Sequence, residues 1–359
     1  MALMDENSFI SKAASPITHH SCWEAPSNIA LIKYWGKVDP QLPKNPSLSF
    51  TLSTSLTKTE VEFHPTTSKK FDFSFFFAGE SKPEFKPKLE QFFNRIASYT
   101  PWLFDYELKI KSENSFPHSS GIASSASAMA ALSLNLMDLE RQLFPDMTAS
   151  FFHQKASFLA RLGSGSAARS VQGPITIWGK NKSLNQSSDL YALPFGADIN
   201  PVFKTYQDCI LLVDKGVKTV TSSQGHELMY KHPFAEQRFL QATRNLSALM
   251  LIMKTGDLDA FIKIVELEAL TLHAMMMTSN PYFILMKANT LAIIEKIWAF
   301  RDSEKIPVCF TLDAGANVHI LYPEEFKSKV NRFIKEELAS FCQNGHYLKD
   351  QVGEGAKKV

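Results

Sequence analysis

The sequence predicts an α+β protein, because strands and helices follow one another without a regular βα alternation. Two hydrophobic patterns lead to this class. Ser47–Phe63 alternates apolar side chains with Ser and Thr, which is the period-2 signature of a half-buried strand or hairpin. Ile122–Leu139 is rich in Ala, Ser, Leu and Met and is strongly helical. The 359 residues suffice for two ordinary domains, or for one large domain with a deep cleft.

The first half of the chain is predicted to contain four strands and three helices. Residues 1–24 are polar, without a strong period, and we expect them to form a loosely held leader. Phe85–Ser98 has apolar residues at helical spacing, and Pro101 follows its end. The expected strands are Ala25–Tyr34, Ser47–Phe63, Phe71–Phe77 and Tyr106–Ile110, and the expected helices are Phe85–Ser98, Ile122–Leu139 and Ala149–Arg161.

The second half starts after a polar segment, Lys180–Ser188, which we expect to be a loop near a domain boundary. We therefore predict an N-terminal domain over residues 25–190, a C-terminal domain over 191–345 and a tail over 346–359. The expected strands are Cys209–Asp214, Pro307–Leu312 and Val318–Tyr322, and the expected helices are Phe234–Lys254, Leu258–Met277, Phe283–Phe300 and Pro323–Phe341.

Composition excludes several classes of protein. Hydrophobic residues make up 45% and charged residues 21%, as in soluble globular proteins, and the net charge of +2 favours neither nucleic acid nor a membrane surface. Neither a secretory signal nor the ~18 apolar residues of a membrane span is present, so we expect a cytoplasmic protein. The four cysteines (Cys22, Cys209, Cys309, Cys342) lack metal-binding spacing and are expected to be free, buried thiols rather than disulfides.

A run of small residues, Pro117-His-Ser-Ser-Gly-Ile-Ala-Ser-Ser-Ala-Ser127, leads into the helix Ile122–Leu139. Small residues let the backbone approach an anion closely, and the first N–H groups of a helix have no partner within it. With the positive end of the helix dipole, they predict a phosphate-binding loop. It is not a Walker A loop, because no Gly-Lys-Ser/Thr follows. The alternative is a Ser/Ala helix face packed tightly on a sheet.

Two further segments carry side chains suited to anions. Gly163-Ser-Gly-Ser-Ala-Ala-Arg-Ser170 offers two hydroxyls and a guanidinium that can grip a phosphate or carboxylate bidentately. The alternative is a flexible Gly/Ser connector with a surface Arg. Ile32-Lys-Tyr-Trp-Gly-Lys37, at a strand end, offers two amines and a hydroxyl. The alternative there is a strand rim with solvated lysines.

A carboxylate stands on the turn Asp313-Ala-Gly-Ala-Asn317, between two predicted strands. Most Asp residues at such positions are turn formers, and a minority are catalytic bases exposed to a cleft. The residue pattern alone leaves both interpretations open.

The order of these motifs is more specific than any one of them. Ala25-Pro-Ser-Asn-Ile-Ala-Leu-Ile-Lys-Tyr-Trp-Gly-Lys37 resembles the N-terminal signature of mevalonate diphosphate decarboxylases, and Asn45-Pro-Ser-Leu-Ser49 resembles their Asn-Ser-Ser-Leu-Ser segment. Asn114–Ser127 resembles the ATP phosphate loop of the wider GHMP kinase superfamily. Gly163–Ser170 and Asp313–Asn317 resemble the family's Gly-Ser-Gly-Ser-Ala-x-Arg-Ser element and Asp-Ala-Gly-Pro-Asn turn. The matches are collinear.

The resemblance implies a GHMP kinase-like α+β fold of two domains with the active site in the cleft between them. It implies ATP-dependent decarboxylation of (R)-5-diphosphomevalonate to isopentenyl diphosphate, ADP, phosphate and CO₂, through a 3-phosphorylated intermediate. Asp313 would accept or orient the proton of the C3 hydroxyl, and Arg169 would hold the substrate carboxylate. Lys33 would lie beside Asp313 and the transferring phosphoryl group.

The remaining site residues are also carried over from the resemblance. The substrate-binding residues would be Asn28, Tyr34, Lys37, Ser164 and Ser166. The ATP phosphates would be bound by Ser119, Ser120, Gly121, Ile122, Ala123, Ser124, Ser125, Ala126 and Ser127. Mg²⁺ would bridge these phosphates, with protein ligands that the sequence does not identify. Family members are often homodimers, so we expect one here.

Some residues depart from the family pattern. Ala316 stands where the family usually has Pro, Pro46 replaces a Ser, and His118-Ser-Ser120 replaces Thr-Ala-Ala. Ser222-Ser-Gln-Gly-His226 resembles the family's Ser-Thr-x-Gly-Met only loosely.

Three other functions remain as alternatives: a decarboxylase of 5-phosphomevalonate that gives isopentenyl phosphate, a kinase that stops at the 3-phosphate, and a non-catalytic nucleotide-binding protein of this fold. Superfamily members that only phosphorylate lack the set of Asp, Lys and Arg that this chain carries as Asp313, Lys33 and Arg169, which favours decarboxylation.

Overall fold

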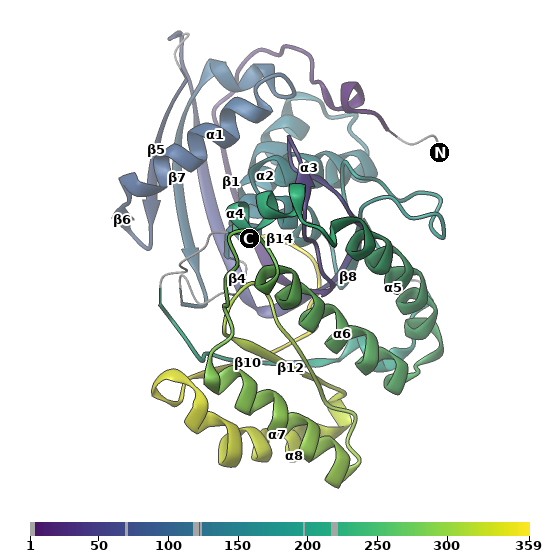
Figure 1. Cartoon of the computed structure of the whole chain (residues 1–359). Helices are drawn as coiled ribbons and strands as arrows, with labels where there is room; N and C mark the ends of the chain where they lie inside the picture. Colours follow the sequence, from purple (N-terminus) through teal and green to yellow (C-terminus); the bar gives the residue numbers. More distant parts are fainter. Residues whose placement is uncertain (1–3, 69–70, 118–121, 123, 197, 217–221) are drawn as a thin grey trace.

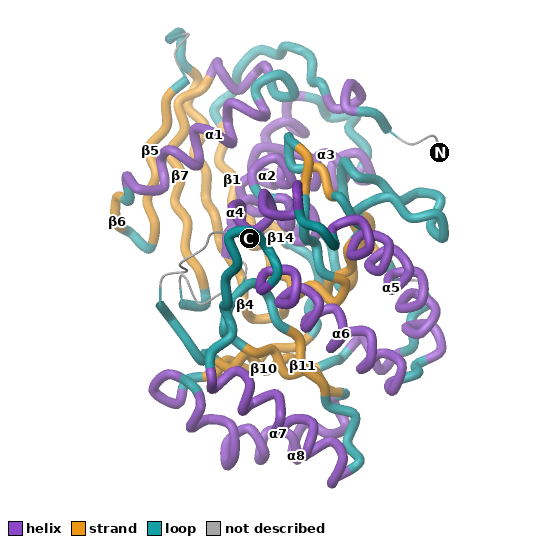
Figure 2. The backbone as a smooth tube through the Cα atoms, viewed as in Figure 1, coloured by secondary structure: helices purple, strands orange, loops and turns teal. Residues whose placement is uncertain are grey.

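The computed structural model describes residues 4–68, 71–117, 122, 124–196, 198–216 and 222–359. In this part of the chain, two sheets and the helices packed on them form the architecture shown in Figures 1 and 2. No helix in these ranges has both the length and the apolar character that crossing a membrane requires.

The first sheet has eight strands in its described part, along the path β14-β1-β4-β7-β5-β6, with β8 beside β4 and β9 beside β8. Only the β5–β7 pair within it is parallel. Its strands are β1 (His19–Ile32), β4 (Ser47–Pro65), β5 (Asp72–Phe77), β6 (Glu80–Ser81), β7 (Tyr106–Asn114), β8 (Ile175–Trp178), β9 (Leu193–Pro194) and β14 (Lys357–Lys358). A separate short hairpin joins β2 (Lys37–Val38) to β3 (Leu42–Pro43).

Strand β4 organises this sheet. One edge pairs with β1 along nearly its whole length, while the other edge pairs first with β8 and then with β7. The alternating Ser47–Phe63 pattern is therefore a single long strand rather than a hairpin. Three helices, α1 (Lys86–Ile96), α2 (Ser124–Leu143) and α3 (Ala149–Gly163), cover one face of the sheet in Figure 1. Phe92, Leu134 and Phe158 from these helices share one core with Val61 and Ile110 of the strands.

The second sheet has the order β11-β12-β10-β13 and is antiparallel. Its strands are β10 (Gln207–Leu211), β11 (Cys309–Thr311), β12 (Val318–Tyr322) and β13 (Tyr347–Gln351). The remaining helices are α4 (Ser222–Leu228), α5 (Ala235–Thr255), α6 (Leu258–Met277), α7 (Ala288–Glu304) and α8 (Lys327–Phe333). Helices α7 and α8 lie on the outer face of this sheet, below β10 and β12 in Figure 1, and bury one set of its side chains.

The two sheets are joined by a shared core. Ile210 and Leu321 from the second sheet pack with Ile29 and Phe50 of β1 and β4, and helices α5 and α6 contribute Leu246 and Val265 to the same cluster. The second sheet therefore packs on the first sheet with one face and on helices α7 and α8 with the other. This arrangement brings the end of β1 close to the turn after β11.

Both ends of the chain are more firmly placed than predicted. Residues 19–24 already belong to β1, and Phe9 is fully buried in the first core, so the described part of the leader is not loosely held. Residues 346–359, predicted as a tail, contain β13 of the second sheet and β14, which pairs with β1. The predicted boundary at residue 190 falls just before β9, which still pairs with β8.

Two predicted helices differ in the structure. Residues 283–287 are not helical, and α7 begins at Ala288, because Phe283 and Leu285 pack instead on a small cluster with Trp35 and Met275. The predicted final helix Pro323–Phe341 starts as a 3₁₀ turn and continues as α8. A π-helical turn, Ile334–Leu338, and a 3₁₀ turn, Ala339–Phe341, complete it. The four cysteines are free and buried, as predicted.

Candidate active site

Lys33 and Asp313, 280 positions apart in the chain, form an ion pair between the two halves of the molecule. Lys33 follows the last residue of β1, and Asp313 follows β11. The Lys33 Nζ donates to Asp313 Oδ1 over 3.0 Å. The lysine side chain is 2% exposed and the aspartate side chain 31% exposed, so the carboxylate still reaches solvent beside a buried ammonium group. Burial lowers the pKa of Lys33, and Asp313 opposes this shift.

The Asp313–Asn317 turn is fixed by three elements around it. The His273 Nε2 of α6 donates to the Asp313 carbonyl at 3.1 Å, and the Thr290 hydroxyl of α7 donates to the Ala316 carbonyl at 2.7 Å. Asn317 Oδ1 accepts the Asp214 N–H at 3.0 Å. Because the Ala316 carbonyl is anchored in this way, the turn does not depend on a proline at that position. Burial lowers the pKa of His273 to about 4, so its ring is neutral at physiological pH.

Arg169 lies in the 3₁₀ helix Gly165–Ser170, between α3 and β8. Its Nε and Nη2 donate to Asn28 Oδ1, each at 3.4 Å, and its Nη1 donates to Ser47 Oγ. Arg169 is 2% exposed, so the alternative of a flexible connector with a surface Arg is wrong. Burial lowers the pKa of Arg169 to about 10, opposed first by Asp313 and then by Tyr34, and the guanidinium remains charged at neutral pH.

Asn28 connects β1 to the 3₁₀ helix that carries Arg169. The β1–β4 register shifts between Pro26 and Asn28, which marks a bulge just before this side chain. Its Nδ2 donates to Ser170 Oγ at 2.7 Å and to the Ser166 carbonyl at 3.2 Å, while its Oδ1 accepts from Arg169. Asn28 is 3% exposed and all its polar atoms are engaged by the protein, so it orients Arg169 in this structure.

Tyr34 and Lys37 line the same region. The Tyr34 ring lies 4.7 Å from the Trp178 ring and 4.3 Å from the His226 ring, measured between centroids. Its hydroxyl is buried without a hydrogen-bond partner among the described residues, and it lies so close to Gly165 that a Cβ there would be 2.7 Å away. The half-buried Lys37 donates to Gln41 at 3.2 Å. The site therefore holds one buried hydroxyl and one amine suited to an oxyanion.

The start of α2 lies beside these residues. The Ser125 hydroxyl is 3.3 Å from the Ser164 hydroxyl, which joins the predicted phosphate loop to the segment that carries Ser166 and Arg169. The Ser27 hydroxyl donates to the Ile122 carbonyl at 2.8 Å. Four of the predicted ATP-binding residues, Ser119, Ser120, Gly121 and Ala123, lie outside the described residues, as does His118.

Ile122 is buried in the core that the two sheets share, and the other described residues of this loop divide into two groups. Ser124 and Ser125 are half-buried at the helix start. Ala126 and Ser127 are buried against the sheet, and the Ser127 hydroxyl lies 2.6 Å from the Thr57 hydroxyl of β4. The tightly packed Ser/Ala face, considered above as an alternative to a phosphate loop, thus describes this second pair, while the first pair faces outward.

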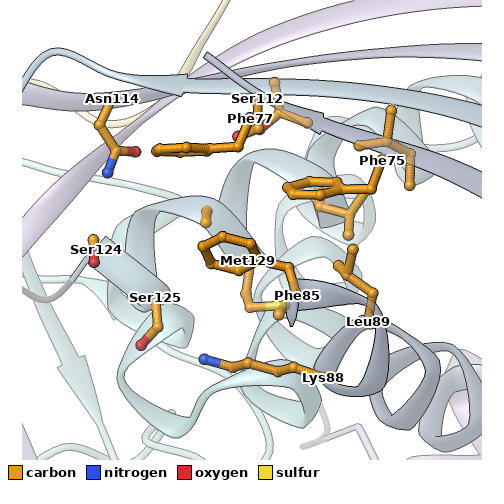
Figure 3. Close-up of a pocket in the computed structure, with 14 residues that line it drawn as sticks. Phe75, Phe77, Phe85, Lys88, Leu89, Ser112, Asn114, Ser124, Ser125 and Met129 are labelled. Carbon is orange, nitrogen blue, oxygen red and sulfur yellow. The ribbon is translucent and has the colours of Figure 1, made fainter. Parts of the chain in front are cut away.

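A cavity of about 250 Å³ opens next to Ser124 and Ser125. Figure 3 shows these two serines at one end and Phe75 and Leu89 at the other, with the Lys88 amine directed toward Ser125. Phe77, Phe85 and Met129 add apolar surface, and Ser112 and Asn114 add polar groups. This cavity was not predicted from the sequence, because its walls come from several elements, among them β4, β5, β7, α1 and α2.

Several residues that shape the site were not predicted as site residues. Glu268 and Arg238 hold the backbone of Lys33, and His226 Nδ1 accepts the Gly36 N–H at 2.9 Å. No cluster of three or more metal-ligating side chains occurs in the part of the chain that the structure describes. A single polar residue within a helix gives no indication in the sequence that it contacts the backbone of a distant residue, as Glu268, Arg238 and His226 do.

Comparison with known proteins decides the family. Residues 25–191 match the family model described as the diphosphomevalonate decarboxylase-like N-terminal domain, and residues 209–357 match the mevalonate 5-diphosphate decarboxylase C-terminal domain. The chain belongs to the mevalonate diphosphate decarboxylase family. Like that family, it is an ATP-dependent decarboxylase, and the α+β, two-domain GHMP-like fold is confirmed.

The chain has a similar sequence identity to each of several relatives. The chain is 30% identical to the diphosphomevalonate decarboxylase of Saccharomyces cerevisiae, over 86% of this chain and 79% of that protein. It is 28% identical to the phosphomevalonate decarboxylase of Haloferax volcanii, over 85% and 89%. Among solved structures, it resembles MDDEF in complex with MVAPP, AMPPCP and magnesium, with 28% identity, a TM-score of 0.81 and coverage of 96% and 99%. The Staphylococcus aureus mevalonate diphosphate decarboxylase gives 27% identity, a TM-score of 0.81 and coverage of 96% and 98%.

Proposed function

We propose that this protein converts ATP and (R)-5-diphosphomevalonate to isopentenyl diphosphate, ADP, phosphate and CO₂. The observation that carries the proposal is the Lys33–Asp313 pair, with Nζ and Oδ1 3.0 Å apart and the carboxylate partly open to solvent. A carboxylate beside a buried cation can accept the proton of an alcohol, while the cation stabilises the charge of a transferring phosphoryl group.

The chemistry requires two steps. A tertiary alcohol is a poor leaving group, so the C3 oxygen first takes the γ-phosphoryl group of ATP and loses its proton to Asp313. The C3–O bond then breaks with departure of phosphate, and the electron pair of the bond to the carboxylate forms the new double bond as CO₂ leaves. Arg169 would hold that carboxylate in line, since its guanidinium is fixed by Asn28 and Ser47.

The anionic tail of the substrate would bind Tyr34, Lys37, Ser164 and Ser166. The buried Tyr34 hydroxyl has no hydrogen-bond partner among the described residues, and a phosphate oxygen would supply one. Lys37 adds positive charge beside it. This set of donors suits the terminal phosphate of a diphosphate, and it also suits a monophosphate.

The nucleotide would bind across the cavity and the start of α2. Its flat base would fill the space between Phe75, Phe77 and Phe85, and its phosphates would point to Ser124 and Ser125 at the helix N-terminus. The hydroxyls of these serines are hard oxygen donors, which fit Mg²⁺ carried by ATP phosphates. When bound, Mg²⁺ neutralises phosphate charge. The similarity to the solved complex of MDDEF with AMPPCP and magnesium supports both ligands.

The second candidate is 5-phosphomevalonate, the substrate class suggested by the similarity to the Haloferax volcanii protein. The two are distinguished by measuring kcat/KM for mevalonate, its 5-phosphate and its 5-diphosphate with saturating ATP. We expect the highest value for the 5-diphosphate, whereas a higher value for the 5-phosphate would replace it. We further propose a cytoplasmic location, in line with the free thiols, and a homodimer, in line with membership of the family.

A further inference from the structure

The backbone of Lys33 is held by side chains rather than by a strand. The β1–β4 ladder ends at Ile32, which pairs with Leu48, so the peptide groups of Lys33 lie beyond it. The Lys33 N–H donates to Glu268 Oε2 of α6 at 2.9 Å. Its carbonyl accepts from Arg238 Nη2 of α5 at 3.3 Å and from Asn45 Nδ2 at 2.9 Å.

Arg238 and Glu268 themselves form a buried, two-pronged ion pair. Arg238 Nη1 lies 2.9 Å from Glu268 Oε1, and Arg238 Nη2 lies 2.5 Å from Glu268 Oε2. Both side chains are 0% exposed. Asn245 Nδ2 donates to Glu268 Oε1 at 2.6 Å, so both carboxylate oxygens are fully engaged and the carboxylate cannot rotate without losing several bonds.

Such a pair is a weak source of stability. Removing two charges from water costs about as much as their attraction returns, and well-packed apolar residues often serve equally well in that respect. Apolar residues cannot supply an acceptor for the N–H and a donor for the carbonyl of the same residue at fixed positions. The pair provides these to the residue that reaches Asp313 from the first sheet.

We propose that Arg238 and Glu268 are positioning residues, which fix the Lys33 backbone so that its ammonium group reaches Asp313. The proposal rests on the role proposed above for Lys33 and Asp313. The pair lies on α5 and α6, which contribute to the core that the two sheets share, so it sets the position of the end of β1 relative to the second half of the molecule.

The test removes the pair without leaving a buried charge. The double variant Arg238→Met/Glu268→Leu keeps the volume apolar, and its matched control is Lys155→Met/Glu140→Leu. Lys155 and Glu140 are also buried, with side chains 0% and 3% exposed and an Nζ–Oε1 distance of 2.8 Å, and they contact none of the site residues named above. The measurements are Tm, and kcat and KM for ADP release.

We expect the Arg238/Glu268 double variant to fold and to lose at least about tenfold in kcat, with KM for both substrates changed by less than about threefold. The control should keep kcat within about twofold, whatever its Tm. A folded double variant with wild-type kcat would overturn the proposal, and so would an equal loss in the control.

A second variant covers failure of the double variant to fold. Arg238→Lys keeps the charge but loses the planar fork. We expect it to fold and to show an intermediate kcat, and wild-type kcat would overturn the proposal. Because ADP release is measured, this test remains valid if the wild-type enzyme forms ADP without CO₂, an outcome that would refute the proposed function alone.

Discussion

At the scale of single residues, the site depends on charges that burial would disfavour without their partners. Lys33 is buried against Asp313, and Arg169 is buried against Asn28 and Ser47. The charge of Asp313 opposes the lowering of the Lys33 pKa by burial, and the oxygens of Asn28 and Ser47 accept hydrogen bonds from the Arg169 guanidinium. The substrate then meets cations that are already oriented, which is the arrangement that stabilises charge in a transition state.

The role of Asp313 as proton acceptor is tested with Asp313→Asn. The amide keeps the shape but accepts no proton, and a positioned base contributes about 10²–10⁴ in rate. We expect kcat to fall by about that factor while KM changes little. Asp198→Asn, at a side chain that is 76% exposed, is the control and should be active. Retention of most turnover in Asp313→Asn would show that Asp313 is only a turn former.

The role of Arg169 is tested by two substitutions. Arg169→Ala removes charge-assisted hydrogen bonds worth ~1.5–3 kcal/mol, and it leaves Asn28 and Ser47 without their donor. Arg169→Lys keeps the charge but cannot reach both partners at once. For CO₂ release, kcat/KM should decrease from wild type to Lys to Ala, with Ala reduced at least about tenfold. Equal values for the three proteins would exclude a role in holding the carboxylate.

At the scale of elements, the start of α2 combines the predicted phosphate loop with a first turn that faces the cavity. The helix presents Ser124 and Ser125 outward next to the cavity, while Ser127 is tied to Thr57 of β4. The helix is thereby fixed to the sheet while its first turn remains open to a ligand.

Ser125→Glu tests this geometry. A carboxylate next to the ATP phosphates repels them, so nucleotide affinity measured by calorimetry should be lost in a variant with a wild-type circular dichroism spectrum. Ser125→Gln adds nearly the same bulk without the charge and should bind ATP more tightly than Ser125→Glu. If Ser125→Glu binds ATP as the wild type does, the phosphates lie elsewhere.

Most elements could be predicted because their patterns are local. Val318–Tyr322 and Leu258–Met277 have the predicted bounds, since continuous apolar runs with clear ends determine them. Residues 283–287 could not be predicted, because Phe283 and Leu285 pack in a cluster with Trp35, which is distant in sequence. The first residues of β1, His19–Glu24, and the C-terminal strands β13 and β14 were missed for the same reason, as β14 is defined by its pairing with β1.

At the scale of the whole molecule, the site exists because two halves of the chain share one core. Resemblance to a family named Lys33, Arg169 and Asp313, and the structure brings Lys33 and Asp313 into contact. The residues that hold them, Glu268 and Arg238, lie in helix interiors where a charged residue normally indicates a solvated face. No local pattern distinguishes these buried charges from exposed ones.

The same buried architecture predicts a dependence of stability on pH. Burial lowers the pKa of His273 to about 4, so its neutral form stabilises the fold fully above pH ~6.5, and this contribution is lost as the pH falls toward 4. Between pH 7.5 and pH 5, the wild type should lose about 2 kcal/mol more unfolding free energy in urea than His273→Gln. Equal losses would show that His273 does not contribute.

The most direct test of the account is the stoichiometry of one turnover. The wild-type enzyme is mixed with Mg²⁺, ATP and (R)-5-diphosphomevalonate and quenched at intervals, and ADP, CO₂ and 3-phosphorylated acid are measured together. Because Asp313, Lys33 and Arg169 are assigned to one site that completes both steps, ADP and CO₂ should accumulate in a ratio of about one, without a stable phosphorylated acid. ADP formed without CO₂, together with an accumulating 3-phosphate, would contradict the account and identify a kinase.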